Sequence, residues 1–491
     1  MNEFLENLKD VTNYTYTENG ALAHKTTKRA VYDMFALGAA YRVRSKEDCI
    51  LLFKKALEED EELALKCLFY LRDIRGGQGE RRFFRICFEW LCNEYPEIAE
   101  RNLINISEYG RWDDVIYATQ FTSLKEKAFR LLKEQLALDL KSKTPSLLGK
   151  WLPSENASSK KTKKAAFAFR EYLTMTHKQY RKILSMLREK INIVERLMSE
   201  NRWDEIEFDK IPSKAGLVYR NAFARRDILA KKYEAFVKDK STKVNASSLF
   251  PYEIVEKVID HGGYAGKFNF DDIERAALDK YWKNLPDYLE GKDCSMMCII
   301  DTSASMWGRP EAVAISLGMY CAERIGEPFK DYFVSFSREA DLIKIEGVDF
   351  ADKVTRIYSQ NVCENTNIDN VFKLFKDIAL KNPKAKETMP KTLVIISDME
   401  IDCGSTDWTI KNAATHMENI RKEWESLGLT MPHLIYWNVE SRNENKFLDS
   451  GDNVTFVSGC SPIIFKSVLT GKTGYELCLE ILNSDRYKNI K

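Results

Sequence analysis

Apolar residues return at steps of three and four through most of the first 290 residues, the spacing that places them on one face of an α-helix. Two examples are Cys49, Leu52, Phe53 and Ala56, and Phe84, Cys87, Phe88 and Leu91. Strand patterns are scarce here, and Gly, Pro or Asn interrupts the helical stretches, as at Gly76-Gly77 and Tyr95-Pro96. This pattern predicts short and medium helices stacked in pairs, a HEAT-like helical-repeat arrangement.

A weak internal similarity agrees with repeated helix pairs. The segment Gly110-Arg111-Trp112-Asp113-Asp114 is echoed by Asn201-Arg202-Trp203-Asp204-Glu205. Two short matches about 90 residues apart reflect either real repetition or chance, and the sequence leaves both open.

After about residue 292 the pattern changes to alternating strands and helices. Apolar runs predict strands at 296–300, 332–336, 393–397, 434–439 and 454–457, and helices at 310–325, along a face from Ile368 to Ala379, and near 408–424. This alternation predicts a doubly wound parallel sheet with helices on both faces, whose ligands bind at the carboxyl ends of the strands. We therefore expect a mainly α-helical domain at residues 1–291 and an α/β domain at residues 292–491.

Oxygen-bearing side chains follow two of these predicted strands. The first strand ends in Asp301-Thr302-Ser303-Ala304-Ser305, Asp398 ends the run 393–397, and Thr366 lies between them. Mg²⁺ takes about six oxygen ligands, keeps several waters and uses only one or two carboxylates.

The set thus predicts a site for Mg²⁺ or another divalent cation. Ser303 and Ser305 would bind directly, Thr366 directly or through water, and Asp301 and Asp398 through water or behind the ligands. One position would stay open for an acidic group of a protein partner. The alternative is an ordinary polar turn after a buried strand.

The formal net charge is only +1, so an electrostatic partner must be recognised by a local patch. The richest patch is 141–190, where thirteen Lys or Arg face only Glu155, Glu171 and Glu189. Its core contains Lys160, Lys161, Lys163 and Lys164. RNA phosphates would be attracted here, and the nearby Phe167, Phe169, Tyr172 and Tyr180 could stack on unpaired bases. The alternative is a solvated loop before an amphipathic helix with its aromatic rings in the core.

A second candidate for phosphate binding is the loop Gly76-Gly77-Gln78-Gly79, which is flanked by Arg72, Arg75, Arg81 and Arg82. It lacks the Gly-Lys-Ser/Thr of a P-loop and does not follow a strand. A tight turn between helices that needs glycine explains it equally well.

The motif at 301–305 with Thr366 and Asp398 resembles the metal ion-dependent adhesion site (MIDAS) of von Willebrand factor A (vWA) domains, over about residues 292–491. Asn365 stands where many of these domains have Gly. Helical repeats before such a domain resemble the Ro autoantigen (TROVE) family, and Tyr70–Arg81 is similar to TROVE-like vWA proteins. The resemblance implies a ribonucleoprotein: a helical-repeat ring closed by the vWA domain, with structured or misfolded RNA on its basic surfaces.

Other classes of function find little support. The five His are scattered without zinc spacing, and the eleven Cys form no CxxC pair and are expected to be reduced core residues. We expect no signal peptide, no membrane span and a cytoplasmic location. Carboxylates that hold a cation are poor proton carriers, so we expect no enzyme. The rival to RNA binding is a protein-interaction scaffold in which helical repeats and cation site both bind polypeptides.

Overall fold

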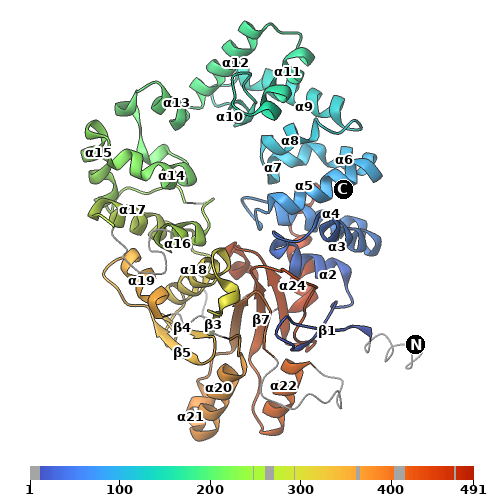
Figure 1. Ribbon diagram of the computed structural model, residues 1–491, viewed down its shortest axis with the longest axis vertical. Coiled ribbons are helices and arrows are strands. Elements are labelled where there is room, and N and C mark those ends of the chain that lie inside the picture. Colours follow the sequence, from blue (N-terminus) through green and yellow to red (C-terminus); the bar gives the residue numbers. More distant parts are fainter. Residues whose placement is uncertain are drawn as a thin grey trace. The chain divides into compact units, whose positions relative to one another are not determined.

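The computed structural model describes residues 12–246, 248–259, 270–291, 294–360, 365–402, 415–468 and 472–491. The chain forms two compact units. Unit 1 comprises Met1–Cys67 and Ala246–Ser484, and unit 2 comprises Leu68–Asn245 and Asp485–Lys491. Figure 1 labels the elements of both.

Unit 2 is built from helices, and its described residues between 68 and 245 contain no strand. After α4 (Glu61–Arg72), which leads into the unit, the helices are α5 (Arg81–Glu94), α6 (Pro96–Asn102), α7 (Ile106–Tyr109), α8 (Trp112–Ala118), α9 (Lys125–Lys141), α10 (Leu148–Trp151), α11 (Lys160–Tyr172), α12 (His177–Lys190), α13 (Val194–Ser199), α14 (Ser213–Ala224) and α15 (Asp227–Lys238). Consecutive helices α5 and α6, and α14 and α15, pack against each other. The predicted helical character of this stretch is confirmed.

Aromatic rings link neighbouring helices of unit 2. The ring of Phe69 lies 5.4 Å from that of Phe84, and the ring of Phe129 on α9 lies 5.8 Å from that of Phe169 on α11. The end of the chain joins this unit, because Arg486 donates to the buried carboxylate of Asp73. Such contacts explain why a chain of short helices forms a compact unit, since isolated helices of this length are marginal in water.

Unit 1 contains a six-stranded sheet in the order β5-β4-β3-β6-β7-β8. Its strands are β3 (Met296–Asp301), β4 (Tyr332–Phe336), β5 (Ala340–Lys344), β6 (Thr392–Ser397), β7 (His433–Asn438) and β8 (Val454–Ser458). All five predicted strands are present, and their pairing is parallel. The sheet also has a strand that the sequence did not predict, β5, which pairs antiparallel to β4 at the edge.

The helices of unit 1 after residue 245 are α16 (Pro251–Ile259), α17 (Asp272–Lys283), α18 (Arg309–Arg324), α19 (Phe350–Gln360), α20 (Asp369–Lys381), α21 (Pro383–Glu387), α22 (His416–Ser426), α23 (Phe465–Val468) and α24 (Gly474–Leu482). Helix α18 packs on β3, where a Cβ on Gly318 would come within 2.9 Å of Ile300. The predicted helix near 408–424 is seen from His416 onward, and its earlier part lies outside the described residues.

A short antiparallel hairpin precedes the first helices and has no counterpart in the sequence prediction. It consists of β1 (Tyr14–Tyr16) and β2 (Leu22–His24), followed by α2 (Ala30–Leu37) and α3 (Lys46–Glu59). Helix α2 packs on β8. The N-terminal segment therefore belongs to the unit that contains the sheet.

The change from helices to alternating strands and helices lies where the sequence indicated, between α17 and β3. The compact units divide the chain differently, since residues 1–67 and 246–291 join the sheet. The domain boundary at 291/292 stays a prediction. Among the described residues, no helix combines the length and apolar character needed to cross a bilayer. Nine of the Cys are described, and all nine are buried and free of disulfides.

Candidate cation site and nucleic-acid surface

The candidate cation site lies at the carboxyl ends of β3 and β6, two neighbouring parallel strands. The chain continues from β3 to β4 on one side and later returns to β6 on the other, so this is the switch point of the sheet, where open α/β sheets bind ligands. Asp301, the last residue of β3, is fully buried. Its carboxylate accepts from the Ser303 backbone at 2.9 Å and from the Ser397 hydroxyl at 2.6 Å.

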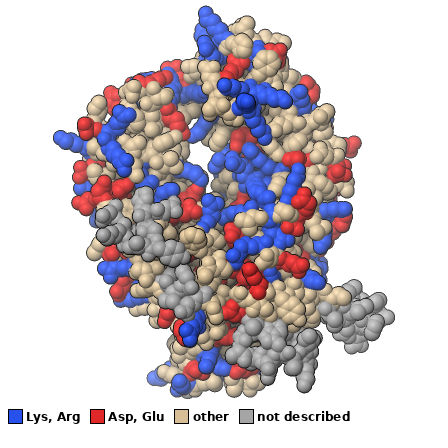
Figure 2. Space-filling model, viewed as in Figure 1, with Lys and Arg blue, Asp and Glu red and all other residues tan. Residues whose placement is uncertain are grey.

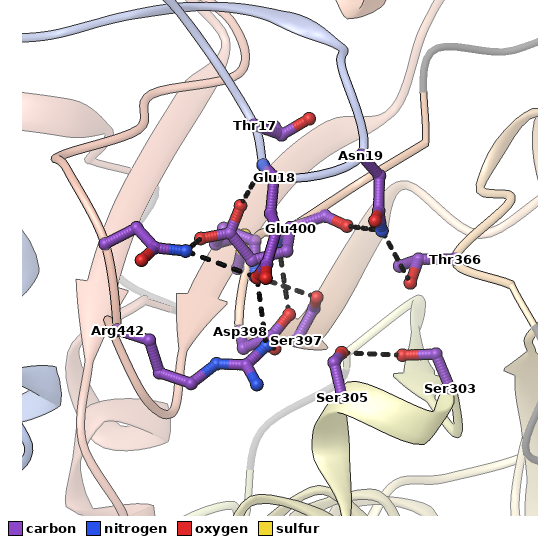
Figure 3. Close-up of polar contacts among 12 residues, drawn as sticks. Thr17, Glu18, Asn19, Ser303, Ser305, Thr366, Ser397, Asp398, Glu400 and Arg442 are labelled. Atoms are coloured by element: carbon purple, nitrogen blue, oxygen red, sulfur yellow. Dashed lines mark hydrogen bonds and ion pairs between the residues drawn. The ribbon is translucent and has the colours of Figure 1, made fainter.

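Ser303 immediately precedes a short 3₁₀ turn at Ala304–Met306, and Ser305 lies within it. Their hydroxyl oxygens lie 3.0 Å apart, so the turn brings the two predicted ligands together. Ser305 also acts on the carboxylate of Asp398, just after β6, where it opposes the rise in pKa that burial causes. Figure 3 shows these side chains facing one another.

Asp398 is buried and already has a cationic partner. Its Oδ2 accepts from Nη2 of Arg442 at 2.5 Å, and its Oδ1 accepts from the Glu400 backbone at 3.1 Å. Burial raises the pKa of Asp398, although Arg442 acts against this shift. Burial and the nearby Asp398 charge raise the pKa of Asp301. Each carboxylate thus opposes ionisation of the other.

Thr366 is buried and is contacted by the loop between β1 and β2. Its hydroxyl lies 3.5 Å from Nδ2 of Asn19, and its carbonyl accepts from the Asp402 backbone at 3.0 Å. In Figure 3 Thr366 lies on the same side of the site as Asn19. Sequence reasoning missed Asn19 and Arg442, because residues so distant in sequence from the motif carry no spacing signal.

The composition of this donor set fits a hard divalent cation. Hydroxyls of Ser303, Ser305 and Thr366 accompany only two carboxylates, the mixture that Mg²⁺ accepts when water fills the remaining positions. The Arg442 guanidinium shows that Asp398 already binds positive charge, and a divalent cation would stabilise both carboxylates in their charged forms. Among the described residues, no group of three or more His, Cys, Asp or Glu is arranged to hold a metal ion. A cation at this place would therefore need the hydroxyl oxygens as ligands.

A second candidate site lies entirely within unit 2, where helices α5, α8 and α11 bring cations together. We call it the basic surface and define it by Arg81, Arg85, Arg111 and Lys161, with the rings of Tyr117 and Trp151. Arg85 pairs with Asp113 at 2.9 Å and Asp114 at 2.8 Å, and Arg81 pairs with Asp113 at 3.3 Å. Figure 2 shows Lys and Arg gathered over this part of the unit.

Positive charge exceeds negative charge at the basic surface. Burial and the neighbouring Arg72 and Arg81 charges lower the pKa of Arg111, although Asp113 and Asp114 act against this shift. Like charges that act on one another in this way cost free energy in the folded protein. A bound anion would remove that cost.

Two aromatic rings lie among these cations. The Arg85 guanidinium lies 4.8 Å and the Lys161 ammonium 5.7 Å from the centroid of the Tyr117 ring, and Arg111 lies 5.2 Å from that of Trp151. Both rings are partly exposed. Cations beside accessible rings are the combination that binds phosphates and stacks on unpaired bases.

The four predicted lysines are all exposed, in the first five residues of α11. Ser159 caps this helix by accepting from the Thr162 backbone at 3.4 Å, and its first turn has no acidic residue. The N-terminus of a helix carries partial positive charge, so lysines there add to an unfavourable potential. Lys161 connects this patch to the ring of Tyr117 and hence to Arg85.

Arg72 is removed from the candidate RNA contacts. Its guanidinium is buried and donates to Asp114 at 2.6 and 2.9 Å. The exposed Arg75 donates to the carbonyl of Glu108, and the exposed Arg82 stays a candidate.

The glycines of the adjacent loop serve close packing. A Cβ on Gly77 would lie 2.0 Å from the carbonyl oxygen of Tyr70, and one on Gly76 would lie 2.4 Å from Nε of Arg486. Gly79 has a φ of 70°, which favours glycine. The tight-turn interpretation therefore explains this loop.

The four rings predicted to stack on bases are placed differently from one another. Phe169 and Tyr180 are buried, so their rings belong to the core of unit 2. Tyr172 donates to Glu126 at 2.9 Å, and Phe167 is 52% exposed. The rings that meet cations at the basic surface are instead Tyr117 and Trp151. Sequence reasoning did not predict Arg111 as an RNA contact. The sequence feature that could have pointed to it is the Arg-Trp-Asp pattern at 111–113, which recurs at 202–204.

Two family models match the chain. One, described as a domain of unknown function (DUF2828), matches residues 17–126 and 148–293, more than half of the chain. The other, described as a domain of unknown function (DUF7788), matches residues 294–486. Neither description names a vWA domain, so that resemblance stays a prediction.

Similar proteins include the uncharacterized protein L728 of Acanthamoeba polyphaga mimivirus, which is 28% identical over 506 residues, covering 94% of this chain and 86% of that protein. A similar solved structure is the crystal structure of the Deinococcus radiodurans Ro (RSR) protein, with 12% identity, a TM-score of 0.40, and coverage of 93% of this chain and 96% of that one. Similarity at this level supports no conclusion on function.

Proposed function

The chain belongs to the family described as a domain of unknown function (DUF2828), and for this member we propose non-catalytic binding of RNA through the basic surface of unit 2. The observation that carries the proposal is the placement of Arg85 and Lys161 beside the ring of Tyr117 and of Arg111 beside the ring of Trp151, with the Arg81 charge close enough to act on Arg111. RNA binding is also what the sequence resemblance to the Ro family implies.

Unpaired RNA fits this surface better than a duplex does. Guanidinium groups and lysines attract phosphates of either form, but stacking on Tyr117 or Trp151 requires a base that has left its helix. The four exposed lysines of α11 extend the positive potential beyond the rings. We therefore expect single-stranded regions of structured or misfolded RNA to be preferred.

The test is fluorescence anisotropy with a labelled single-stranded RNA of about 20 nucleotides, in low salt. Substituting Arg111 by Gln and Trp151 by Ala should weaken binding at least tenfold, since one phosphate contact and one stacking platform are removed. Lys231→Ala changes an exposed lysine on α15 of the same unit and serves as the control. If the wild type does not bind RNA at all, the scaffold function is favoured instead.

A second function, cation-dependent docking of a protein partner, is favoured by the meeting of Asp301, Ser303, Ser305 and Asp398 at the switch point of the sheet. The ion would bind to these oxygens and to Thr366, and an acidic side chain would complete its shell. Calorimetric titration of Mn²⁺ should show one site in the wild type and none in Asp398→Ala. Equal binding by both proteins would remove the cation site.

A further inference from the structure

The loop between β1 and β2 is fixed to the segment that follows β6, beside the candidate cation site. The Thr17 hydroxyl donates to the Ile401 carbonyl at 2.6 Å, the Glu18 backbone donates to Glu400 Oε2 at 2.6 Å, and Asn19 Nδ2 donates to the Glu400 carbonyl at 2.6 Å. Gly20 then forms a β-bridge with Asp402. Four consecutive residues thus hold this loop in one position, and Figure 3 shows Glu18 and Asn19 beside Glu400.

This attachment places the Glu18 side chain near the site. One nitrogen of Arg442, Nη2, lies 2.5 Å from Asp398 and 3.8 Å from Glu18. A single cationic group therefore lies between a buried carboxylate and the carboxylate of the loop. The Glu18 side chain is 56% exposed, so it can change rotamer without disturbing the core.

The charged groups around the site have a net negative charge, which favours binding of one divalent ion. Lys446 is committed to Glu400, since the two pair at 2.7 Å and are both almost completely buried. Among the described residues that hydrogen bonds and ion pairs join to the site, the remaining carboxylates are Asp301, Asp398 and Glu18, and the remaining cation is Arg442. These four groups carry three negative charges and one positive charge, so an ion of charge +2 would offset the excess of negative charge among them.

We infer that Glu18 is the chain's own acidic ligand for the position that the cation leaves open, and that Arg442 takes the cation's place when no divalent ion is bound. This inference rests on the proposed cation site. It means that the site is closed by an internal carboxylate, which an acidic group from a protein partner must displace. Besides Arg442, the Glu18 carboxylate has a hydrogen bond from Asn443 Nδ2 at 3.2 Å. Because Glu18 is 56% exposed, water can replace that bond when the side chain leaves.

The experiment is calorimetric titration of Mn²⁺ into the full chain and three variants. Glu18→Gln keeps the shape but removes the charge, and should bind Mn²⁺ about tenfold more weakly. Arg442→Gln removes the competing cation and should bind several-fold more tightly. Glu425→Gln, an exposed change on α22 of the same unit, is the control and should match the wild type.

Sodium acetate separates a ligand from a structural residue. Acetate at tens of millimolar supplies a free carboxylate, so it should restore most of the lost affinity to Glu18→Gln and leave the wild type unchanged. Weaker binding without rescue would mean that Glu18 only holds the loop, and unchanged binding would mean that it is no ligand; either overturns the inference. Weaker or unchanged binding by Arg442→Gln overturns the role given to Arg442. If the wild type itself binds no Mn²⁺, the proposed cation site is wrong, and the inference about Glu18 falls with it.

Discussion

At the scale of single residues, burial decides whether an arginine can bind RNA or only pairs with a carboxylate inside the protein. Arg72 and Arg81 flank the same glycine-rich loop, yet Arg72 is buried against Asp114 while Arg81 is exposed at the start of α5. The sequence predicted one role for both, because nothing in the local pattern distinguishes a guanidinium that turns inward. Its partner is 42 residues away and is brought near only by the fold.

The buried pair gives a prediction on stability. Arg72→Met leaves Asp114 in the core with only Arg85 as a charged partner, so it should lower the free energy of unfolding by about 3 kcal/mol. Arg81→Met removes an exposed pair and should change it by no more than about 0.5 kcal/mol. Thermal unfolding of the two variants measures the difference, and equal midpoints would show that the Arg72 pair contributes no more than a surface pair.

His433 gives a prediction on pH. Burial lowers the pKa of this residue to about 4, and its Nε2 lies 2.9 Å from the Thr455 hydroxyl. The unfolded chain therefore binds a proton at higher pH than the folded chain does. The neutral His433 therefore contributes to the free energy of unfolding. This contribution is fully present above the unfolded pKa of about 6.5 and is lost as the pH falls toward 4.

Between pH 7 and 5 the free energy of unfolding of the wild type should therefore fall by about 2 kcal/mol more than that of His433→Asn. Denaturant unfolding at the two pH values measures this difference. Parallel losses in both proteins would show that His433 does not contribute to the acid sensitivity.

At the scale of elements, the helix α11 combines a favourable cap with an unfavourable charge pattern. Ser159 caps the helix, but lysines at its positive end repel one another and the partial charge of the helix terminus. Replacing Lys160, Lys161, Lys163 and Lys164 by Ala should therefore raise the free energy of unfolding by about 1 kcal/mol. A loss of more than about 1 kcal/mol in thermal unfolding would show that these lysines serve the fold.

The elements that the sequence predicted best are those with long apolar runs. The strands β3 and β6 are completely or almost completely buried, so their side chains had to be apolar on both faces. By contrast, β5 exposes most of its residues at the edge of the sheet, and β1 and β2 have three residues each, too few to show a period. The cation motif was found because it directly follows β3, whereas the loop that carries Glu18 had no local signal.

At the scale of the whole molecule, the two candidate sites lie in different compact units, so their functions should separate. Ser303→Ala combined with Ser305→Ala removes two hydroxyls from the cation site in unit 1. RNA affinity should then stay within about threefold, or roughly 0.7 kcal/mol, because the basic surface is unchanged. Anisotropy titration tests this, and a tenfold loss of affinity in a folded double variant would show that the ion contributes to RNA binding.

The central claim is that RNA is bound electrostatically by unit 2, and the salt dependence of affinity tests it most directly. Each neutralised phosphate of a single strand contributes about −0.7 to the slope of log K against log salt. If each of the four α11 lysines neutralises one phosphate, replacing them by Ala should make the wild-type slope less steep by about 3 units. The control replaces the exposed Lys210, Lys231, Lys240 and Lys243 of unit 2 and should keep most of that slope. If the α11 variant has the same slope and affinity as the wild type, RNA is not bound where this account places it.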